Sequence, residues 1–221
     1  MNPERLLALL HFSSPSLPVG AFAHSQGLAA AVELGWVCNE TNLAAWLAGV
    51  LEHGLGRLDL PVLLRLHAAV LARDGEALGH WDSLLQASRE TSELLLEEKR
   101  LGKALLRLLR DQNLLPDFAL PAEAGYVTMF AVACAKQGIP ALETALGFAW
   151  SWLENQVAVA CKTIPLGQTA AQRVLLSLSP RVVASAELAQ KLKDEELGGT
   201  LPGVALASSL HETQYSRMFR S

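Results

Sequence analysis

Histidine is the side chain most often used to hold a transition metal, and its spacing in this chain predicts no preformed metal site. The six histidines are His11, His24, His53, His67, His80 and His211. No two lie three or four residues apart, so no helix can present two imidazoles on one face. A ready site needs several converging ligands. His24 and His211 are the two that could bind a metal singly, and we expect no stably bound metal cofactor.

Motifs for nucleophilic and nucleotide chemistry are missing as well. Ser14, His24 and Asp59 supply the residue types of a hydrolase triad, but the chain has no G-x-S-x-G elbow, and a triad is defined by geometry. Residues 198–203 have the glycine spacing of a phosphate-binding loop, yet Val204 stands where that loop needs lysine. Glu52 and His53 are adjacent, unlike the Glu-x-x-His pairs of di-metal bundles. We expect no catalytic residues and no enzyme.

The elements that would position any site are helices. Apolar residues recur at helical spacing along most of the chain, while strand alternation is nearly absent. The predicted helical segments are 3–11, 25–34, 41–51, 59–73, 76–88, 91–112, 124–137, 140–162, 168–178 and a last one that starts at Pro180. Asn39 or Thr41 is expected to cap the third segment, Asp59 the fourth, and Gln168 or Thr169 the ninth. The sequence therefore predicts an all-α protein, a single bundle of about ten helices.

The segment 91–112 has the clearest amphipathic pattern. Leu94, Leu101, Leu105 and Leu108 lie on a stripe that should be buried. A second face of this segment carries Glu93, Glu97, Arg100, Lys103, Arg107 and Arg110. Two interpretations stay open for that face: an ordinary solvated surface, or a basic ridge that docks an acidic partner.

Composition narrows the class of protein further. Apolar residues make up 51% of the chain and charged residues only 18%, so part of the apolar surface could be covered by partners. A net charge of −4 argues against a nucleic-acid-binding protein. No apolar run reaches the roughly 18 residues of a membrane span. The three widely spaced cysteines indicate reduced thiols and a cytoplasmic location.

Two internal segments are unusual for a plain bundle. Residues 13–28 read SSPSLPVGAFAHSQGL, which predicts an ordered loop with Phe22 anchored in the core. Residues 160–173 read ACKTIPLGQTAAQR, in which Pro165 and Gly167 turn the chain between two helices. Each can be a purely structural turn.

The third unusual segment is SSLHETQYSRMFRS, residues 208–221. It has no apolar stripe long enough to dock on its own chain, so it predicts a polar tail. Tyr215, Met218 and Phe219 lie among arginines, and aromatic residues, methionine and arginine are enriched at protein interfaces. We therefore divide the chain into a helical domain, residues 1–207, and a partner-binding tail, residues 208–221, which orders on binding.

Together these segments resemble the urease accessory protein family UreF. The resemblance runs along essentially the whole chain and includes EEKRLG at residues 97–102, PLGQT at 165–169 and the long ending from Ser209. It implies an all-α homodimer that binds UreD (also called UreH) and recruits UreG, a nickel-carrying GTPase that binds GTP. The assembly would act on apo-urease, with nickel handled by the complex and neither nucleic acid nor membrane involved.

The resemblance also assigns candidate residues. The tail residues expected to contact UreD are Ser208, Leu210, His211, Glu212, Tyr215, Arg217, Phe219 and Arg220. The residues assigned to a UreG-facing surface or a nickel passage are Arg100, Lys162, Pro165, Gln168 and Arg173. The residues of the structural loop motif are Pro15, Pro18, Gly20, Phe22, Ser25 and Gly27.

The chain departs from the family pattern at two positions. Ala29 stands where the family often has Glu, so any role of that carboxylate falls to another residue, with Glu33 as a candidate. His24 stands where an aromatic Tyr is usual.

Two alternatives to a scaffold remain. The first is a GTPase-activating protein that inserts Arg100, Arg107 or Arg173 into UreG. The second is an unrelated helical enzyme, which would need a pocket of converging polar groups.

Overall fold

A computed structural model describes residues 1–221 and contains ten α-helices and no strand. The all-α prediction is confirmed. The α-helices are α1 (Pro3–Phe12), α2 (Leu28–Glu33), α3 (Glu40–Gly49), α4 (Asp59–Ala72), α5 (Gly75–Ala87), α6 (Ser92–Asp111), α7 (Tyr126–Lys136), α8 (Ala141–Thr163), α9 (Gln168–Ala189) and α10 (Pro202–Glu212). Two short 3-10 turns, η1 (Ala21–Ala23) and η3 (Asp194–Glu196), and a π-helical turn, η2 (Val50–Leu55), complete the structure.

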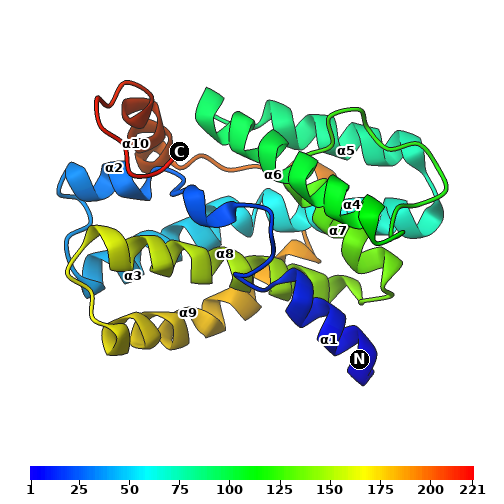
Figure 1. Cartoon of the computed structure of the whole chain (residues 1–221), viewed down its shortest axis with the longest axis horizontal. Coiled ribbons are helices and arrows are strands. Elements are labelled where there is room, and N and C mark those ends of the chain that lie inside the picture. The colour runs from blue at the N-terminus through cyan, green and yellow to red at the C-terminus, as the bar shows by residue number, and fades with distance from the viewer.

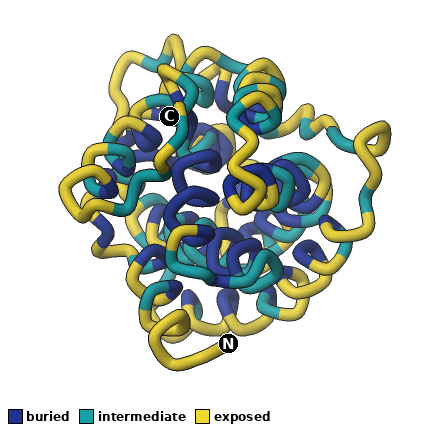
Figure 2. The backbone as a smooth tube through the Cα atoms, turned by 90° about the vertical axis from the view of Figure 1, so that its right-hand side faces the viewer, coloured by how far each residue is buried: buried dark blue, intermediate teal, exposed yellow.

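The helices α4, α7 and α8 lie at the centre of the bundle. Helix α4 packs against α5, α7, α8 and α9, while α6 covers α7 and α9 covers α8. In Figure 1, α4–α7 group on one side and α2, α3, α8, α9 and α10 on the other. The buried apolar side chains form one continuous cluster. The buried positions along the backbone are concentrated toward the centre of the molecule (Figure 2). A single core therefore holds both groups of helices together.

Carboxylates from neighbouring helices cap the buried start of α7. Its N-cap residue, Gly125, has no side chain to satisfy the free backbone N–H groups. Asp82 of α5 accepts hydrogen bonds from the Gly125 N–H at 2.9 Å and the Thr128 hydroxyl at 2.6 Å, and Glu98 of α6 accepts one from the Val127 N–H at 2.9 Å. Glu98 is thus a buried structural residue.

Helix α9 corrects the prediction that one helix ends near Leu178 and another starts at Pro180. The helix continues through Pro180 from Gln168 to Ala189. Proline has no N–H to bond the Leu176 carbonyl one turn earlier. The Ser179 hydroxyl donates to that carbonyl at 2.9 Å instead, so the helix passes the proline without leaving the oxygen unpaired.

Helix starts were predicted with mixed success. Asn39 caps α3, as one of the two expected alternatives, by accepting a hydrogen bond from the Asn42 N–H at 3.0 Å. Asp59 was expected to cap α4, but Leu58 occupies the N-cap position and the Asp59 carboxylate pairs with Arg89. Gly167, rather than Gln168 or Thr169, is the N-cap of α9.

The C-terminal part of the chain is folded onto the bundle. Helix α10 packs on α2 (Figure 1), and the expected boundary between residues 207 and 208 lies inside this helix. The prediction that residues 208–221 cannot dock on their own chain is wrong, since Ser208, His211, Phe219 and Ser221 are all buried. Separately, none of the helices is apolar over a length sufficient to traverse a bilayer.

Candidate partner-binding segment and internal cavity

The loop of residues 13–28 forms the platform for residues 202–221, which we call the C-terminal segment. Leu17 and Val19 anchor it in the core, while the stiffening Pro15 and Pro18 remain exposed. The expectation that Phe22 is the anchor is wrong, because its side chain is 65% exposed. The leucine and valine beside the prolines provide the anchoring that we assigned to the aromatic residue.

Gly27 allows α10 to approach this platform closely. Its φ of +81° is a conformation that L-residues with side chains rarely adopt. A Cβ at this position would lie 3.2 Å from the backbone nitrogen of Ser208. Gly20, with φ of +85°, makes the turn into η1, and a Cβ there would have no neighbour within 4 Å. The backbone conformation therefore favours glycine at both positions. Only at Gly27 does the close approach of α10 also require it.

Polar contacts join α10 to the first turn of α6. The hydroxyls of Thr91 and Ser208 lie 2.7 Å apart, and Glu212 accepts a hydrogen bond from the Ser92 hydroxyl at 2.6 Å. Nearby, the imidazole Nδ1 of His211 lies 2.7 Å from a Glu93 carboxylate oxygen. Arg217 donates to the other oxygen of Glu93. Four of the residues expected to contact UreD thus contact their own chain.

Apolar side chains remain on the outer face of the same segment. We define the outer apolar set by its exposed residues, which are Leu206, Leu210, Tyr215 and Met218. Tyr215 is fully exposed and Met218 is 70% exposed. Phe219 points the opposite way, is 5% exposed, and carries the Lys162 ammonium 5.8 Å from its ring centre. The segment is therefore anchored by one aromatic residue and offers another to solvent.

A shallow hollow lies between α6 and the C-terminal segment. Arg100, Arg217 and Arg220 line it together with Phe219 and the acids Glu93 and Glu212. Arg100 and Arg220 are exposed and form no ion pair, whereas Arg217 pairs with Glu93. The unpaired guanidinium groups of Arg100 and Arg220 are suited to bind carboxylate or phosphate groups.

The other residues assigned to a UreG surface or nickel passage do not converge on this hollow. Pro165 and Gln168 are exposed at the turn between α8 and α9. Arg173 forms a two-point ion pair with Glu40 of α3. Lys162 lies beside Phe219. All five residues are on the surface, and the structure gathers only Arg100 and Lys162 near the C-terminal segment.

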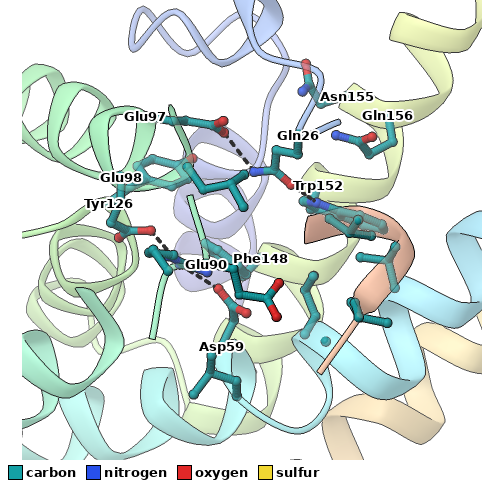
Figure 3. Close-up of a pocket in the computed structure, with 18 of the residues that line it drawn as sticks. Gln26, Asp59, Glu90, Glu97, Glu98, Tyr126, Phe148, Trp152, Asn155 and Gln156 are labelled. Carbon is teal, nitrogen blue, oxygen red and sulfur yellow. Dashed lines mark hydrogen bonds and ion pairs between the residues drawn. The ribbon is translucent and has the colours of Figure 1, made fainter. Parts of the chain in front are cut away.

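A cavity of about 150 Å³ lies between the loop before α2 and helices α4, α6 and α8, next to the start of α10 (Figure 3). Its apolar wall includes Leu94, Leu101, Phe148 and Trp152. Its polar wall is formed by Gln26, Asp59, Ser88, Arg89, Glu90, Glu97, Glu98, Tyr126, Ser151, Asn155 and Gln156. The cavity thus has room for a few water molecules or a small ion, and acids outnumber bases around it.

Two ion pairs organise one side of the cavity. The Arg89 guanidinium lies 2.7 Å from Asp59 and 2.6 Å from Glu98. These neighbouring carboxylates raise the arginine pKa further above its ordinary value, against the effect of burial. Arg89 Nε and the Nε2 atom of Gln156 are buried without a hydrogen-bond partner. Both are donors at the cavity wall and can bind an oxygen atom that enters it.

Glu97 and His24 face each other near the end of the chain, with Glu97 Oε2 3.5 Å from His24 Nδ1. Burial raises the pKa of Glu97 to about 7. Burial, assisted by Arg220 and Arg100, lowers the pKa of His24 to about 4. His24 is therefore neutral at physiological pH, and the pair is a polar contact rather than a salt bridge. Nowhere does the structure bring three or more His, Cys, Asp or Glu side chains into a metal-holding arrangement.

Comparison with known proteins identifies the family. Residues 37–179 match the UreF family. The whole chain is 55% identical to the urease accessory protein UreF of Chromohalobacter salexigens, 96% of which is covered. It is 57% identical over 217 residues to UreF of Marinobacter nauticus, with 98% of this chain and 94% of that protein covered. The chain belongs to the UreF family.

The UreF relatives align with the C-terminal segment as well as with the body. The alignment with the Chromohalobacter protein spans 100% of this chain. UreF of Psychrobacter cryohalolentis is 54% identical over an alignment that spans 98% of this chain. The resemblance drawn from the sequence motifs is thus confirmed, and the loop, the cavity and the C-terminal segment belong to one UreF-type chain.

The cavity residues were missed from the sequence, although one signal was present. Glu97 follows Leu94 by three residues and precedes Leu101 by four, so it lies on the apolar stripe and not on the second, charged face to which we assigned it. The structure places it 5% exposed. Gln26, Trp152 and Gln156 gave no comparable signal, because their convergence depends on how α8 packs on the loop.

Proposed function

We propose that this UreF-family chain is a non-catalytic scaffold in a UreD/UreF/UreG complex that delivers nickel into apo-urease. In this proposal the chain works in the cytoplasm as a homodimer. UreG carries the GTP, and the complex handles nickel as cargo, so the chain itself keeps no cofactor. The absence of hydrolase and nucleotide-binding motifs and the family membership support this role.

The observation that carries the proposal is the outer apolar set on an anchored segment. Large apolar side chains exposed together are typical of a protein–protein interface. Tyr215 and Met218 are of the types that interfaces enrich, and they flank the exposed Arg217. Because α10 and Phe219 hold the segment on the body, these side chains form a surface that is already ordered before a partner binds. We assign this surface to UreD.

The test is a binding assay with UreD that leaves the anchor intact. Truncation after Leu206 would remove the buried residues Ser208, His211 and Phe219, so it would uncover the core as well as delete the surface. The double variant Tyr215→Ser, Met218→Ser is cleaner. We expect it to weaken UreD binding at least tenfold, while Leu71→Ser, at an exposed leucine of α4, binds normally. Equal affinity of both variants would exclude this surface.

We further assign the route of nickel to the cavity. The side-chain oxygens of Glu90, Asn155 and Gln156 in its wall are weaker nickel ligands than clustered imidazoles, which suits a cargo ion that must be released. Large side chains that fill the cavity, such as Ser151→Trp, should lower urease activation without abolishing complex assembly. Undiminished activation by a folded variant would contradict this route.

A GTPase-activating role is the second candidate, and one observation favours it. Arg100 is exposed in the hollow and has no acidic partner, so it is free to reach a phosphate. Arg173 is less suitable because it is held by Glu40. Single-turnover GTP hydrolysis by UreG should slow with Arg100→Ala if this role is correct. Unchanged rates at a saturating concentration of the variant would exclude it.

A further inference from the structure

A chain of buried hydrogen bonds connects the cavity wall to the end of the C-terminal segment. The indole Nε1 of Trp152 donates to Gln26 Oε1 at 2.6 Å, and Gln26 Nε2 donates to Glu97 Oε1 at 2.7 Å (Figure 3). The Ser221 hydroxyl donates to the other Glu97 oxygen at 2.6 Å. His24 Nδ1 lies 3.1 Å from the same hydroxyl. Glu97 is thus the link between helix α8 and Ser221.

Backbone pairing also fixes this end of the segment. The Arg220 N–H donates to the Ala23 carbonyl at 2.8 Å, and the Ser25 N–H donates to the Ser221 carbonyl at 2.9 Å. The Ser25 hydroxyl donates to that carbonyl too. These bonds reach only the loop before α2. Among residues 218–221, the Ser221–Glu97 bond is the one side-chain hydrogen bond to a helix of the body.

We propose that Glu97 is a positioning residue for partner binding: by holding Ser221, it seats the C-terminal segment and so fixes how Tyr215 and Met218 are presented. This inference rests on the proposed function, in which those two side chains contact UreD. The carboxyl group does not contact the partner itself, because it is buried beneath the segment.

The seating should respond to protonation of Glu97. When Glu97 is ionised, His24 donates to Ser221 and Ser221 donates to the carboxylate. When Glu97 is protonated, the direction reverses: the carboxyl donates to Ser221, and Ser221 donates to the unprotonated Nδ1 of His24. Both arrangements are available because His24 is neutral, with its pKa lowered to about 4. The hydrogen bonds that join Glu97, Ser221 and His24 therefore form in either protonation state of Glu97. The free energy of holding the C-terminal segment differs between the two states.

Burial determines which protonation state of Glu97 holds the segment more firmly. It raises the pKa of Glu97 to about 7, against the opposing hydrogen bonds from Ser221 and Gln26. Releasing the segment admits water to the carboxyl group and lowers this pKa, so the seated form binds the proton more tightly. The C-terminal segment should therefore be held most firmly at low pH, and this hold should weaken as the pH rises toward 7. The charged and titratable groups that face Glu97 are Glu98 of α6, Arg89, Tyr126 of α7 and His24, and Arg100 and Arg220 in turn act on His24.

Amide hydrogen exchange in the isolated full-length chain tests this directly. The Arg220 and Ser25 amides report whether the C-terminal segment is held on the body, since each hydrogen-bonds between that segment and the loop before α2. After correction for intrinsic exchange, we expect their protection to fall by at most about tenfold per pH unit as the pH rises toward 7, and to level off above it, as a single proton allows. Glu97→Gln, which mimics the protonated form, should keep its protection at all pH values between about 5 and 8, a range that spans the raised pKa. Glu97→Ala should lose it.

Controls separate positioning from folding. Glu187→Gln removes the same charge at an exposed site on α9 and should behave like the natural sequence. Ser221→Ala breaks the same bond without altering α6, so it carries the test if Glu97→Ala does not fold. Amides within α6, such as Leu105, should stay protected in every folded variant. Unchanged Arg220 protection in Ser221→Ala and in Glu97→Ala, or pH-dependent protection in Glu97→Gln, would overturn the proposal.

UreD binding by the same variants distinguishes the two proposals. Loss of Arg220 protection together with weaker UreD binding supports both of them. Loss of protection with UreD binding unchanged would show that Glu97 seats the segment but that the segment is not the UreD surface. In that case the assignment of function fails while the structural role of Glu97 stands.

Discussion

Gly102 of α6 packs directly against the Ala124 carbonyl that precedes α7, so that a Cβ at Gly102 would overlap the oxygen. The two helices are in backbone contact here. The start of α7 cannot shift without breaking its hydrogen bonds to Asp82 and Glu98. This glycine lies within the EEKRLG motif that the sequence resemblance singled out.

Gly102→Ala should therefore destabilise the protein, by about 2–3 kcal/mol as for other overpacked cores. Gly79→Ala is the matched control, because Gly79 is inside α5 and a Cβ there would have nothing within 4 Å. That variant should be neutral or gain up to about 1 kcal/mol from better helix propensity. Urea unfolding of both variants measures the difference, and equal midpoints would contradict the close approach.

The two neighbouring residues at the end of the segment should differ sharply in their contribution to stability. Phe219 is 5% exposed and Met218 is 70% exposed. Phe219→Ala should lower the free energy of unfolding by about 3 kcal/mol, as for buried phenylalanine, and Met218→Ala by less than about 0.5 kcal/mol. Chemical denaturation compares them. Similar losses would mean that the segment is not seated as described.

Glu97 should make the protein less stable as the pH rises. Its pKa is raised from 4.5 in the free group to about 7 by burial, so the folded chain holds the proton more tightly. The contribution to stability is complete below pH 4.5 and is lost as the pH rises through 7, a change on the order of 3 kcal/mol. Unfolding of Glu97→Gln measured from about pH 5 to 8 should lack this loss, and a slope identical to that of the natural sequence would refute the assignment.

His24 should act in the opposite sense at acid pH. Burial lowers its pKa from 6.5 to about 4, so the unfolded chain binds the proton first. The associated stability is present above pH 6.5 and is lost as the pH falls through 4. His24→Asn keeps a donor near Nδ1 but cannot titrate, and its unfolding midpoint should change less between about pH 6.5 and 4.5. Parallel curves for the two proteins would argue against a buried neutral imidazole.

Pro180 should lower the stability of the protein, and the hydrogen bond from the Ser179 hydroxyl should offset part of that loss. Pro180→Ala restores a backbone donor to the Leu176 carbonyl and should stabilise the protein by about 1–3 kcal/mol. Ser179→Ala alone should destabilise by about 1 kcal/mol, because it leaves that carbonyl unpaired. The same serine change in the Pro180→Ala background should have little effect. A double-mutant cycle with additive effects would contradict the compensation.

Local patterns predicted most of the helices, and the exceptions have physical causes. Asn39 caps α3, and Leu101 and Leu105 of the α6 stripe are buried while Leu94 and Leu108 are half-buried, because both features depend on residues within one or two turns. Pro180 misled the prediction, since a serine hydroxyl replaces the lost hydrogen bond. Nothing in the sequence indicated that residues 208–221 fold back, because their contacts are with loop 23–25 and with α6, far away along the chain.

The candidate site shows the same division. Tyr215 and Met218 were predicted from residue type to contact a partner; both are exposed, and the contact itself stays a prediction. The inward direction of Phe219 and His211 was not, since it depends on a tertiary surface made by α6 and α8. Glu97 could have been placed correctly from its position on the stripe of Leu94 and Leu101, but a carboxylate among leucines is ordinarily assigned to solvent.

The pairing of Ser25 with Ser221 joins residues that are made far apart in time. At about 5–20 residues per second, a ribosome adds the 196 residues between them in roughly 10–40 seconds. During that interval the nascent chain already carries Gln26 and Glu97 but has nothing to cover them. A newly synthesised chain therefore cannot fix this part of the structure until Ser221 has been added.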